Sequence, residues 1–190
     1  LKLYERDGIE GISKLNGMFA IAIYDKPAGA LYLIRDRIGE KPLYYHYDND
    51  LLLFASEIKS ILQVSSPHKV NHDALNQFFA FNYIPPPLTI FDGIFHVKPG
   101  HWLKITAEKI EQRCWWDLAK TTSQERSETE WIDLFNTTLK DAVRIRLRAD
   151  VPFGAFLSGG VDSSSVVGIM SQNLTEPVNT FCIGFDDPLY

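Results

Sequence analysis

The stretch "VPFGAFLSGGVDSSSVVG", residues 151–168, places two adjacent glycines and four serines between two apolar runs. The run "FGAFL" has the composition of a short buried strand. The segment "SSSVVGIMSQ" is typical of a helix with Val166, Val167 and Met170 on its buried side. We therefore predict a strand, a glycine-rich turn and a helix, in that order.

This predicted turn has the chemistry of a phosphate site. Gly159 and Gly160 have no side chains, so their amides can approach an anion closely, and the helix that follows adds its positive N-terminal end. The hydroxyl groups of Ser158, Ser163 and Ser164 can donate hydrogen bonds to phosphate oxygens. A serine-capped helix after a tight turn is the alternative interpretation.

Asp162 does not fit a phosphate site by itself, because its carboxylate would repel a bare anion. It fits either as a helix cap or as a ligand of magnesium, which would offset the charge conflict. The common P-loop is excluded, since it requires a lysine before its Ser or Thr and no lysine lies between Val151 and Tyr190.

Composition bounds the class of protein. The 190 residues carry a formal net charge of −5, so a basic nucleic-acid-binding face is not expected. No apolar run reaches the roughly 20 residues of a membrane span, so no membrane segment is expected. Cys114 and Cys182 lack the spacing of a disulfide framework or a metal site, which favours buried thiols in a reducing, cytoplasmic compartment. The histidines have no metal-ligand spacing either: residues 46, 68, 72, 96 and 101.

Turn formers divide the first third of the chain into short apolar or aromatic runs. We predict an antiparallel meander of four strands, at residues 18–24, 30–35, 43–47 and 51–55. Ser56 is expected to cap a short helix after the last strand, and residues 71–82 are expected to form another helix. Consecutive prolines make residues 84–88 extended, as in a connector between domains. Residues 100–106 and 109–116 can form a hairpin.

A different pattern begins at Ser127. Ser127 and Glu130 have the spacing of a capping box, which predicts a long helix that ends near Arg148. Apolar residues then recur at helical spacing and predict a buried stripe at Trp131, Leu134, Phe135, Leu139, Ala142, Val143 and Leu147.

Four quoted blocks together carry a family resemblance. "SGGVDSS", residues 158–164, resembles the pyrophosphate loop of the N-type ATP pyrophosphatases. Its flanks choose among the families that share this loop. With "LNGMFAIAIYD" (residues 15–25), "RDRIGEKPLYY" (35–45) and "FASEIKSIL" (54–62), the chain resembles glutamine-hydrolysing asparagine synthetase. The blocks occur in the family's order over nearly the whole chain.

The resemblance implies a fold of mixed class, α/β and α+β. Residues 1–65 would be the C-terminal part of an αββα glutaminase (Ntn-type) domain, 66–126 an interdomain connector region, and 127–190 the start of a parallel-sheet ATP pyrophosphatase domain. The family's nucleophilic cysteine lies upstream of Leu1, so we expect no catalytic residue in this chain, which looks like an inactive fragment of a longer enzyme. A homodimer is the assembly that we expect.

The implied activity is that of a carbon–nitrogen ligase with glutamine as amido donor. ATP would convert aspartate into an aspartyl-adenylate, and ammonia from glutamine would then form asparagine. The expected cofactors are ATP and Mg²⁺, and the small-molecule partners are ATP, aspartate and glutamine. The resemblance assigns ATP and pyrophosphate binding to Phe156, Ser158, Gly159, Gly160, Asp162, Ser163, Ser164 and Ile183, with Asp162 also the metal ligand. Phe156 departs from the family, in which aliphatic residues are usual at that position.

Two alternatives remain open. A sibling amide-forming enzyme, such as a β-lactam synthetase or a polysaccharide-cluster amidotransferase, would keep this loop and use another carboxylate. A noncatalytic nucleotide-binding fragment is the second alternative. The charged "RDRIGEKP" segment is interpreted as a turn with exposed or interdomain salt bridges rather than as a catalytic cluster.

Overall fold

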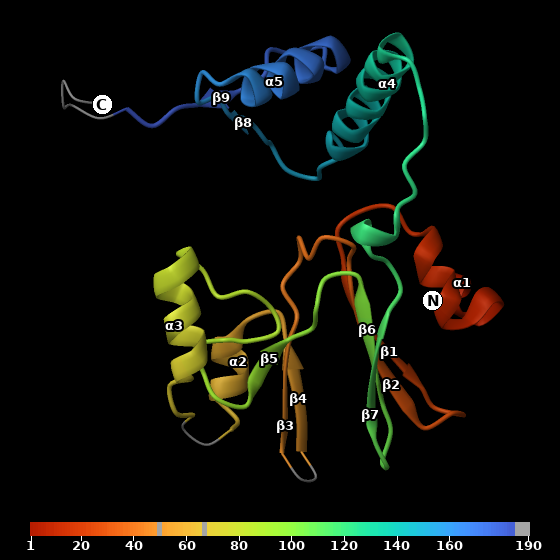
Figure 1. Ribbon diagram of the computed structural model, residues 1–190, viewed down its shortest axis with the longest axis vertical. Coiled ribbons are helices and arrows are strands. Elements are labelled where there is room, and N and C mark those ends of the chain that lie inside the picture. The colour runs from red at the N-terminus through yellow and green to blue at the C-terminus, as the bar shows by residue number, and fades with distance from the viewer. Residues whose placement is uncertain (49–50, 66–67, 185–190) are drawn as a thin grey trace. The chain divides into compact units, whose positions relative to one another are not determined.

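The computed structural model describes residues 1–48, 51–65 and 68–184 (Figure 1). The chain divides into two units, Leu1–Thr122 and Ser123–Tyr190. Each unit has its own secondary structure and its own packing. In the described residues, no helix combines the length and the apolar composition that a membrane crossing requires.

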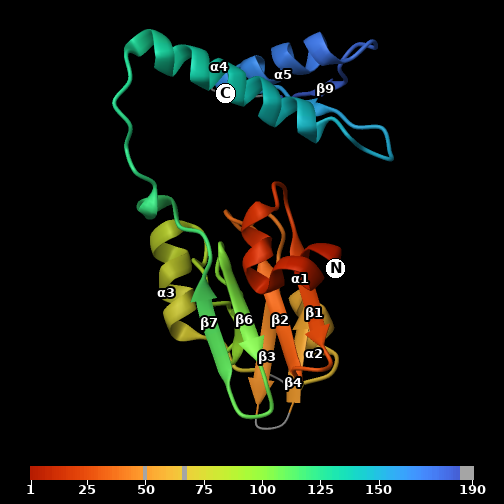
Figure 2. The same ribbon diagram turned by 90° about the vertical axis from the view of Figure 1, so that its right-hand side faces the viewer.

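The first unit contains a four-stranded antiparallel sheet in the order β1-β2-β6-β7 (Figure 2). Its strands are β1 (Ala20–Asp25), β2 (Ala30–Arg35), β6 (His101–Ile105) and β7 (Ile110–Cys114). β6 and β7 form the predicted hairpin, with His101 opposite Cys114. β2 is an interior strand of this sheet, because the edge that does not pair with β1 pairs with β6, where Leu31 lies opposite Ile105.

A second, three-stranded sheet has the order β4-β3-β5. Its strands are β3 (Tyr44–Asp48), β4 (Leu51–Ala55) and β5 (Ile94–His96). All four strands predicted before residue 56 are therefore present, but the prediction of a single meander is wrong. The chain leaves the first sheet after β2, whose outer edge is paired with β6, and starts a new sheet at Tyr44.

Side chains of β2 are buried on both faces, and this places the layers. Tyr32 and Ile34 pack with Ile12 of the N-terminal helical segment, formed by α1 (Lys2–Asp7) and η1 (Gly8–Lys14). Leu33, on the other face, packs with Val97, and Tyr45 of the second sheet lies against the same cluster. Helix α2 (Ile58–Leu62) contacts β3 and β4. The layers thus run helix, sheet, sheet, helix.

The short helices differ from expectation in one cap. Glu57, not Ser56, is the N-cap of α2, and no side chain caps that helix. Glu57 still has extended backbone angles, so Ser56 lies one residue too early to reach the first helical amides. Helix α3 (His72–Phe81) confirms the predicted helix at 71–82, and the Asn71 side chain accepts a hydrogen bond of 3.0 Å from the amide of Ala74.

Residues 66–126 were expected to form a connector, yet described residues in this range supply α3, β5, β6, β7 and the short helix η2 (Leu118–Lys120). The proline-rich segment also lies within the first unit, where the His96 amide donates to the Pro87 carbonyl at 2.8 Å. The structure instead divides the chain after Thr122. The cause is long-range strand pairing, which draws these residues into the sheets.

The turn after β2 is organised by a buried arginine. Arg35 is 6% exposed, and its guanidinium donates to the carbonyl oxygens of Lys41, Gly39 and Val97 at 2.8–2.9 Å. Burial lowers the pKa of Arg35 from its ordinary value. The predicted exposed or interdomain salt bridge is therefore wrong for this residue, which holds backbone carbonyls instead.

Asp36, the next residue, is 1% exposed and satisfies backbone donors. Its carboxylate accepts hydrogen bonds from the amides of Phe19, Glu40 and Lys41 at 2.9–3.2 Å. Two segments that are distant in sequence, the entry to β1 and the turn after β2, are thereby joined through one side chain. Arg35 and Asp36 act as structural residues within the first unit.

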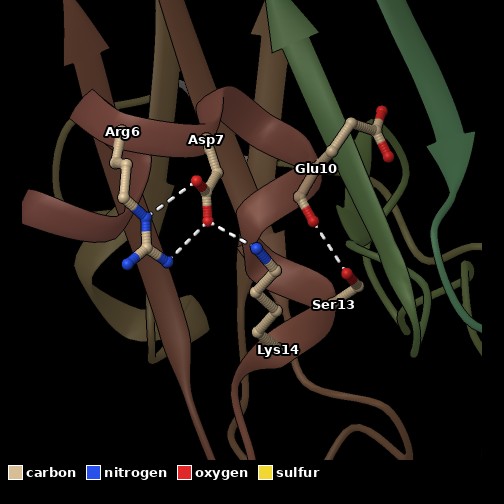
Figure 3. Close-up of polar contacts among 5 residues, drawn as sticks. All are labelled: Arg6, Asp7, Glu10, Ser13 and Lys14. Carbon is tan, nitrogen blue, oxygen red and sulfur yellow. Dashed lines mark hydrogen bonds and ion pairs between the residues drawn. The ribbon is translucent and has the colours of Figure 1, made fainter.

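Polar side chains also join the two helical turns at the N-terminus (Figure 3). The Asp7 carboxylate accepts from Arg6 at 2.7 and 2.8 Å and from Lys14 at 2.7 Å. The hydrogen bond from Arg6 makes the largest contribution and that from Lys14 the next, and together they hold the pKa of Asp7 well below its ordinary value. The Ser13 hydroxyl donates to the main-chain oxygen of Glu10 at 2.8 Å. The cluster ties α1 to η1.

The second unit consists of α4 (Glu128–Arg146), β8 (Ala155–Phe156), α5 (Val161–Asn173) and β9 (Thr180–Phe181). The predicted capping box at the start of α4 is confirmed, with both Ser127 and Glu130 bonded reciprocally. β8 and β9 pair in parallel with α5 between them in the chain. The predicted order of strand, turn and helix is therefore confirmed.

Two burial predictions fail. Of the predicted stripe on α4, only Val143 is buried, and Trp131, Leu134 and Phe135 are 40–65% exposed. Within the described part of the second unit α4 contacts α5, and residues of α4 around Val143 line a groove together with Val166 and Met170 of α5. Both cysteines, expected to be buried, are exposed free thiols.

Candidate functional site

The candidate site lies where β8 ends and α5 begins. The Ala155 amide donates to the Asn179 carbonyl at 2.9 Å, and the Leu157 amide donates to the Phe181 carbonyl at 2.8 Å. These bonds align the ends of two parallel strands. In open parallel sheets, ligands bind outside the carboxyl ends of the strands, which is where this turn lies.

Glycine is required in the turn by its backbone conformation. Gly159 has φ of +82°, in the left-handed region, and no atom lies within 4 Å of the position that a Cβ would take. Gly160 is the N-cap of α5 and offers no capping side chain. The first amides of this 13-residue helix therefore keep their donors for another acceptor, at the positive end of the helix dipole.

The serines hold the turn and stay accessible. The Ser158 and Ser163 hydroxyl oxygens are 3.2 Å apart, and the Ser163 hydroxyl donates to the Gly160 carbonyl at 3.2 Å. The Ser164 amide donates to the same carbonyl at 3.1 Å. Ser158 and Ser164 are exposed. The hydroxyl groups can therefore exchange bonds within the turn for bonds to an incoming anion.

Asp162 lies exposed in the first turn of α5. It does not cap the helix, because no side-chain cap bond is present at the start of α5. The described residues contain no group of three or more His, Cys, Asp or Glu that could hold a metal ion. One carboxylate beside a phosphate site still fits Mg²⁺, which commonly takes one or two carboxylates and completes its shell with substrate phosphates and water.

Two apolar side chains stand at the same strand ends. Phe156 is 76% exposed and Ile183 is 74% exposed. The ring of Phe156 meets that of Phe181 in an edge-on arrangement, with centroids 6.4 Å apart. A Cβ at Gly154 would lie 2.5 Å from the Asn179 oxygen, so this glycine permits the strands to approach. The sequence did not predict the roles of Gly154 and Phe181, because these roles depend on the pairing of β8 with β9.

The structure brings the predicted site residues together in one open feature. Six of them form a single turn and the first turn of the helix: Ser158, Gly159, Gly160, Asp162, Ser163 and Ser164. Phe156 and Ile183 belong to the neighbouring strand ends. The turn is not sealed in a core, so an anion can reach its amides.

Comparison with known proteins identifies the class. Residues 1–116 match the family described as "Glutamine amidotransferase domain", and residues 134–190 match "Asparagine synthase". The first match covers more than half of the chain and the second includes the glycine-rich turn. The chain belongs to the glutamine amidotransferase family, in the asparagine synthetase branch that joins these two domains.

Curated relatives agree with that branch. The chain is 40% identical to "Putative asparagine synthetase [glutamine-hydrolyzing] 2" of Methanocaldococcus jannaschii, over 98% of this chain and 37% of the relative. It is 34% identical to "Asparagine synthetase [glutamine-hydrolyzing] 1" of Bacillus subtilis, over 98% and 29%. "Amidase chry2" of Gibberella zeae is 40% identical, over 90% and 26%. The chain spans about a third of the length of these relatives.

Among solved structures, the chain is similar to glutamine phosphoribosylpyrophosphate amidotransferase from B. subtilis. The match covers 92% of this chain and 35% of that one at 17% identity, with a TM-score of 0.36. A score this low does not carry an assignment of the fold.

Proposed function

We propose that the complete protein is a glutamine-hydrolysing asparagine synthetase and that this chain supplies its ATP pyrophosphate site. The observation that carries the proposal is the exposed turn at Gly159 and Gly160, which lies between the parallel strand β8 and the N-terminus of α5. The family membership supports the same chemistry.

The turn would act on the leaving group of the reaction. Attack of the aspartate carboxylate on the α-phosphorus of ATP breaks the bond to the β-phosphate and releases pyrophosphate, whose negative charge grows as the bond breaks. The amides near Gly159 and Gly160 and the helix N-terminus are preorganised to stabilise that charge. Ser158 and Ser163 would donate to its oxygens. Asp162 would hold Mg²⁺, which supplies positive charge to the phosphates when it is bound.

The base of ATP would lie on the apolar strand ends. Phe156 and Ile183 are exposed beside the turn, so they can cover the adenosine while the phosphates reach the amides. An aromatic ring at residue 156 offers a stacking surface that an aliphatic side chain lacks.

The first unit would belong to the glutaminase domain. Its helix, sheet, sheet, helix layers, which include strands as far as Cys114, support Leu1–Thr122 as part of an αββα, Ntn-type domain, with the nucleophilic cysteine elsewhere in the complete protein. Ammonia released there would attack the adenylate carbonyl, and AMP would leave. A cytoplasmic homodimer is the proposed setting.

A sibling activity on another carboxylate is the second candidate. Two fungal amidases, chry2 of Gibberella zeae and chyE of Penicillium rubens, are 40% and 39% identical to this chain. The glycine-rich turn would serve either activity, because it handles ATP and not the acceptor.

The test measures pyrophosphate release by the complete protein with MgATP and each of several carboxylates. Aspartate-dependent release, abolished by Asp162→Ala while glutamine hydrolysis persists, is the expected result. Ser163→Ala should slow release, whereas Ser165→Ala should not, because the Ser165 hydroxyl donates to its own helix at Val161. Unchanged pyrophosphate release in Asp162→Ala would contradict the metal assignment. Release only with another carboxylate would favour the sibling activity.

A further inference from the structure

The first unit contains a cavity that the proposed function does not use. It has a volume of about 530 Å³ and lies beside β3 and β4. Its polar lining includes His46, His68 and the acidic residues Asp48 and Asp92, and its apolar lining includes Leu51 and Val64. None of these residues belongs to the glycine-rich turn.

His46 presents an unpaired acceptor to this cavity. The residue is 9% exposed, and its Nδ1 lies 2.8 Å from the Gly93 carbonyl oxygen. A carbonyl only accepts hydrogen bonds, so Nδ1 carries the proton of the neutral ring and Nε2 keeps a lone pair. Among the described residues Nε2 has no hydrogen-bond partner.

His68 fixes the wall next to His46. Its Nδ1 lies 2.6 Å from the main-chain oxygen of Asp92, and its Nε2 lies 2.8 Å from the Ser65 hydroxyl. In the neutral ring Nδ1 donates to that oxygen, and Nε2 lies against the Ser65 hydroxyl, whose single proton is also within donating distance, 2.9 Å, of the Ile61 carbonyl. Both nitrogens of His68 are therefore engaged. The two imidazole rings meet edge-on, with centroids 4.8 Å apart. His68 therefore holds the wall in place, and His46 remains available.

The remaining polar groups are acceptors as well. Asp48 and Asp92 are exposed at the rim, and no lysine or arginine of the described residues lines the cavity. A metal ion is not the matching ligand, because the described residues include no group of three potential ligands with suitable placement. Acceptors of this kind select a ligand that donates hydrogen bonds and carries positive charge.

We propose that this cavity binds a primary alkylammonium group. Such a group has three N–H donors and a positive charge, which the His46 lone pair and the Asp48 and Asp92 carboxylates complement. Leu51 and Val64 supply an apolar wall for the aliphatic stem. The ammonium belongs either to a free amine or to a lysine side chain of a protein.

The experiment titrates the 190-residue chain, with ¹⁵N-labelled histidine, against n-butylammonium chloride and follows the imidazole resonances by NMR. Saturable shifts centred on His46 Nε2 are expected. Two probes separate the contributions, since 1-butanol has the stem without the charge and tetramethylammonium has the charge without N–H donors. Both should bind at least about threefold more weakly, on the scale of exposed charge interactions.

Variants test the rim. Asp92→Asn keeps the main-chain oxygen that His68 uses, and it should weaken butylammonium binding about threefold, as should Asp48→Asn. Asp73→Asn removes the same charge from an exposed position on α3 and should leave the affinity unchanged. Shifts that do not saturate, an equal response to 1-butanol, or unchanged affinity in both rim variants would overturn the proposal.

A last arm distinguishes the source of the ammonium. Nα-acetyl-lysine-N-methylamide presents the same group on a peptide backbone. Tighter binding of this compound than of butylammonium supports a protein lysine as the ligand, whereas tighter binding of butylammonium supports a free amine. The proposal does not depend on the synthetase assignment, and its failure would leave that assignment intact.

Discussion

Leu33 and Ile34 are neighbours on β2, point to opposite faces of their sheet, and are both 0% exposed. Phe156 and Phe181 face each other on β8 and β9 and are 76% and 57% exposed. The first pair lies in a unit with apolar layers on both sides of its central sheet. The second pair lies on a two-stranded sheet whose described neighbours leave these rings uncovered.

The buried core and the proposed binding site therefore lie in different units. The described core residues lie mostly in the first unit, whereas the glycine-rich turn proposed to bind phosphate lies in the second. The second unit buries only Val143 and Met170 among its described apolar side chains. Regions with few buried apolar contacts open at lower free energy than core strands. The second unit should therefore be the more easily unfolded part, unless a ligand stabilises it.

The largest expected effect comes from emptying the first core. Leu33→Ala removes a fully buried side chain and should lower the free energy of unfolding of the first unit by about 3–4 kcal/mol. Val143→Ala in the second unit should cost only about 1–2 kcal/mol, because a smaller side chain is lost beside an open groove. Urea denaturation measures both, and equal costs would contradict the proposed difference between the units.

Removing the charge of Asp36 is the next test. Asp36→Asn replaces one acceptor oxygen by an amide donor in a buried site that faces backbone N–H groups. We expect the first unit to lose about 2 kcal/mol of stability. Asp133→Asn, an exposed carboxylate on α4, serves as the control for urea denaturation. A cost for Asp36→Asn as small as that of the control would refute the structural role of this carboxylate.

Gly159→Ala tests the site without emptying a core. Alanine at a φ of +82° is strained by about 1 kcal/mol, although no atom blocks its Cβ. MgATP binding by the complete protein should weaken about fivefold, as measured by calorimetry, with the first unit unaffected. Gly168→Ala, inside α5 and also in open space, should retain binding and stabilise the helix. Equal loss of binding in both variants would argue against the turn.

The pH dependence of the first unit supplies a smaller effect. Burial, and then the charge of Arg35, lower the pKa of His96 to about 4 from its ordinary value of 6.5. The unfolded chain therefore binds more protons between these values, so stability should fall by about 1 kcal/mol as pH drops from 6.5 to 4, once solvent screening is allowed for. His96→Gln should flatten that part of the stability profile in urea titrations. An unchanged slope would contradict the pKa direction.

The smallest effect is expected at the exposed N-terminal cluster. Asp7→Asn removes the charge that Arg6 and Lys14 bind, so the melting temperature at pH 7 should fall slightly. The pKa of Asp7 is lowered, so this contribution is present above the ordinary carboxyl pKa and is lost as pH falls below it. Glu10→Gln is the matched control, since Figure 3 shows only its main-chain oxygen bonded to Ser13. Equal shifts of the melting temperature for Asp7→Asn and Glu10→Gln, measured by calorimetry, would show that the cluster does not stabilise the protein.

Local signals in the sequence predicted local structure well. The Ser127 capping box, the helix after Asn71 and the hairpin ending at Cys114 each depend on residues a few positions apart. The glycine-rich turn was located for the same reason, because its geometry depends on Gly159, Gly160 and the helix that follows directly.

The local sequence pattern did not predict which distant strands pair or which apolar side chains are buried. Nothing in residues 18–55 indicates that β2 has β6 as its neighbour, so the division into two sheets was missed. Periodicity on α4 marks an apolar face and does not say what covers it, which explains the exposed Trp131 and Phe135. His46 and His68 are brought together by β3 and a loop, so their spacing in the chain carried no signal.

The pairing of Leu31 with Ile105 also has a consequence for synthesis on the ribosome. The central sheet cannot close until β6 has left the exit tunnel, and until then β2 exposes a free apolar edge that is able to pair with another chain. Nascent chains stalled before residue 100 should therefore be the species that chaperones capture. Chains extended beyond β7 should fold their first unit before the second unit is complete.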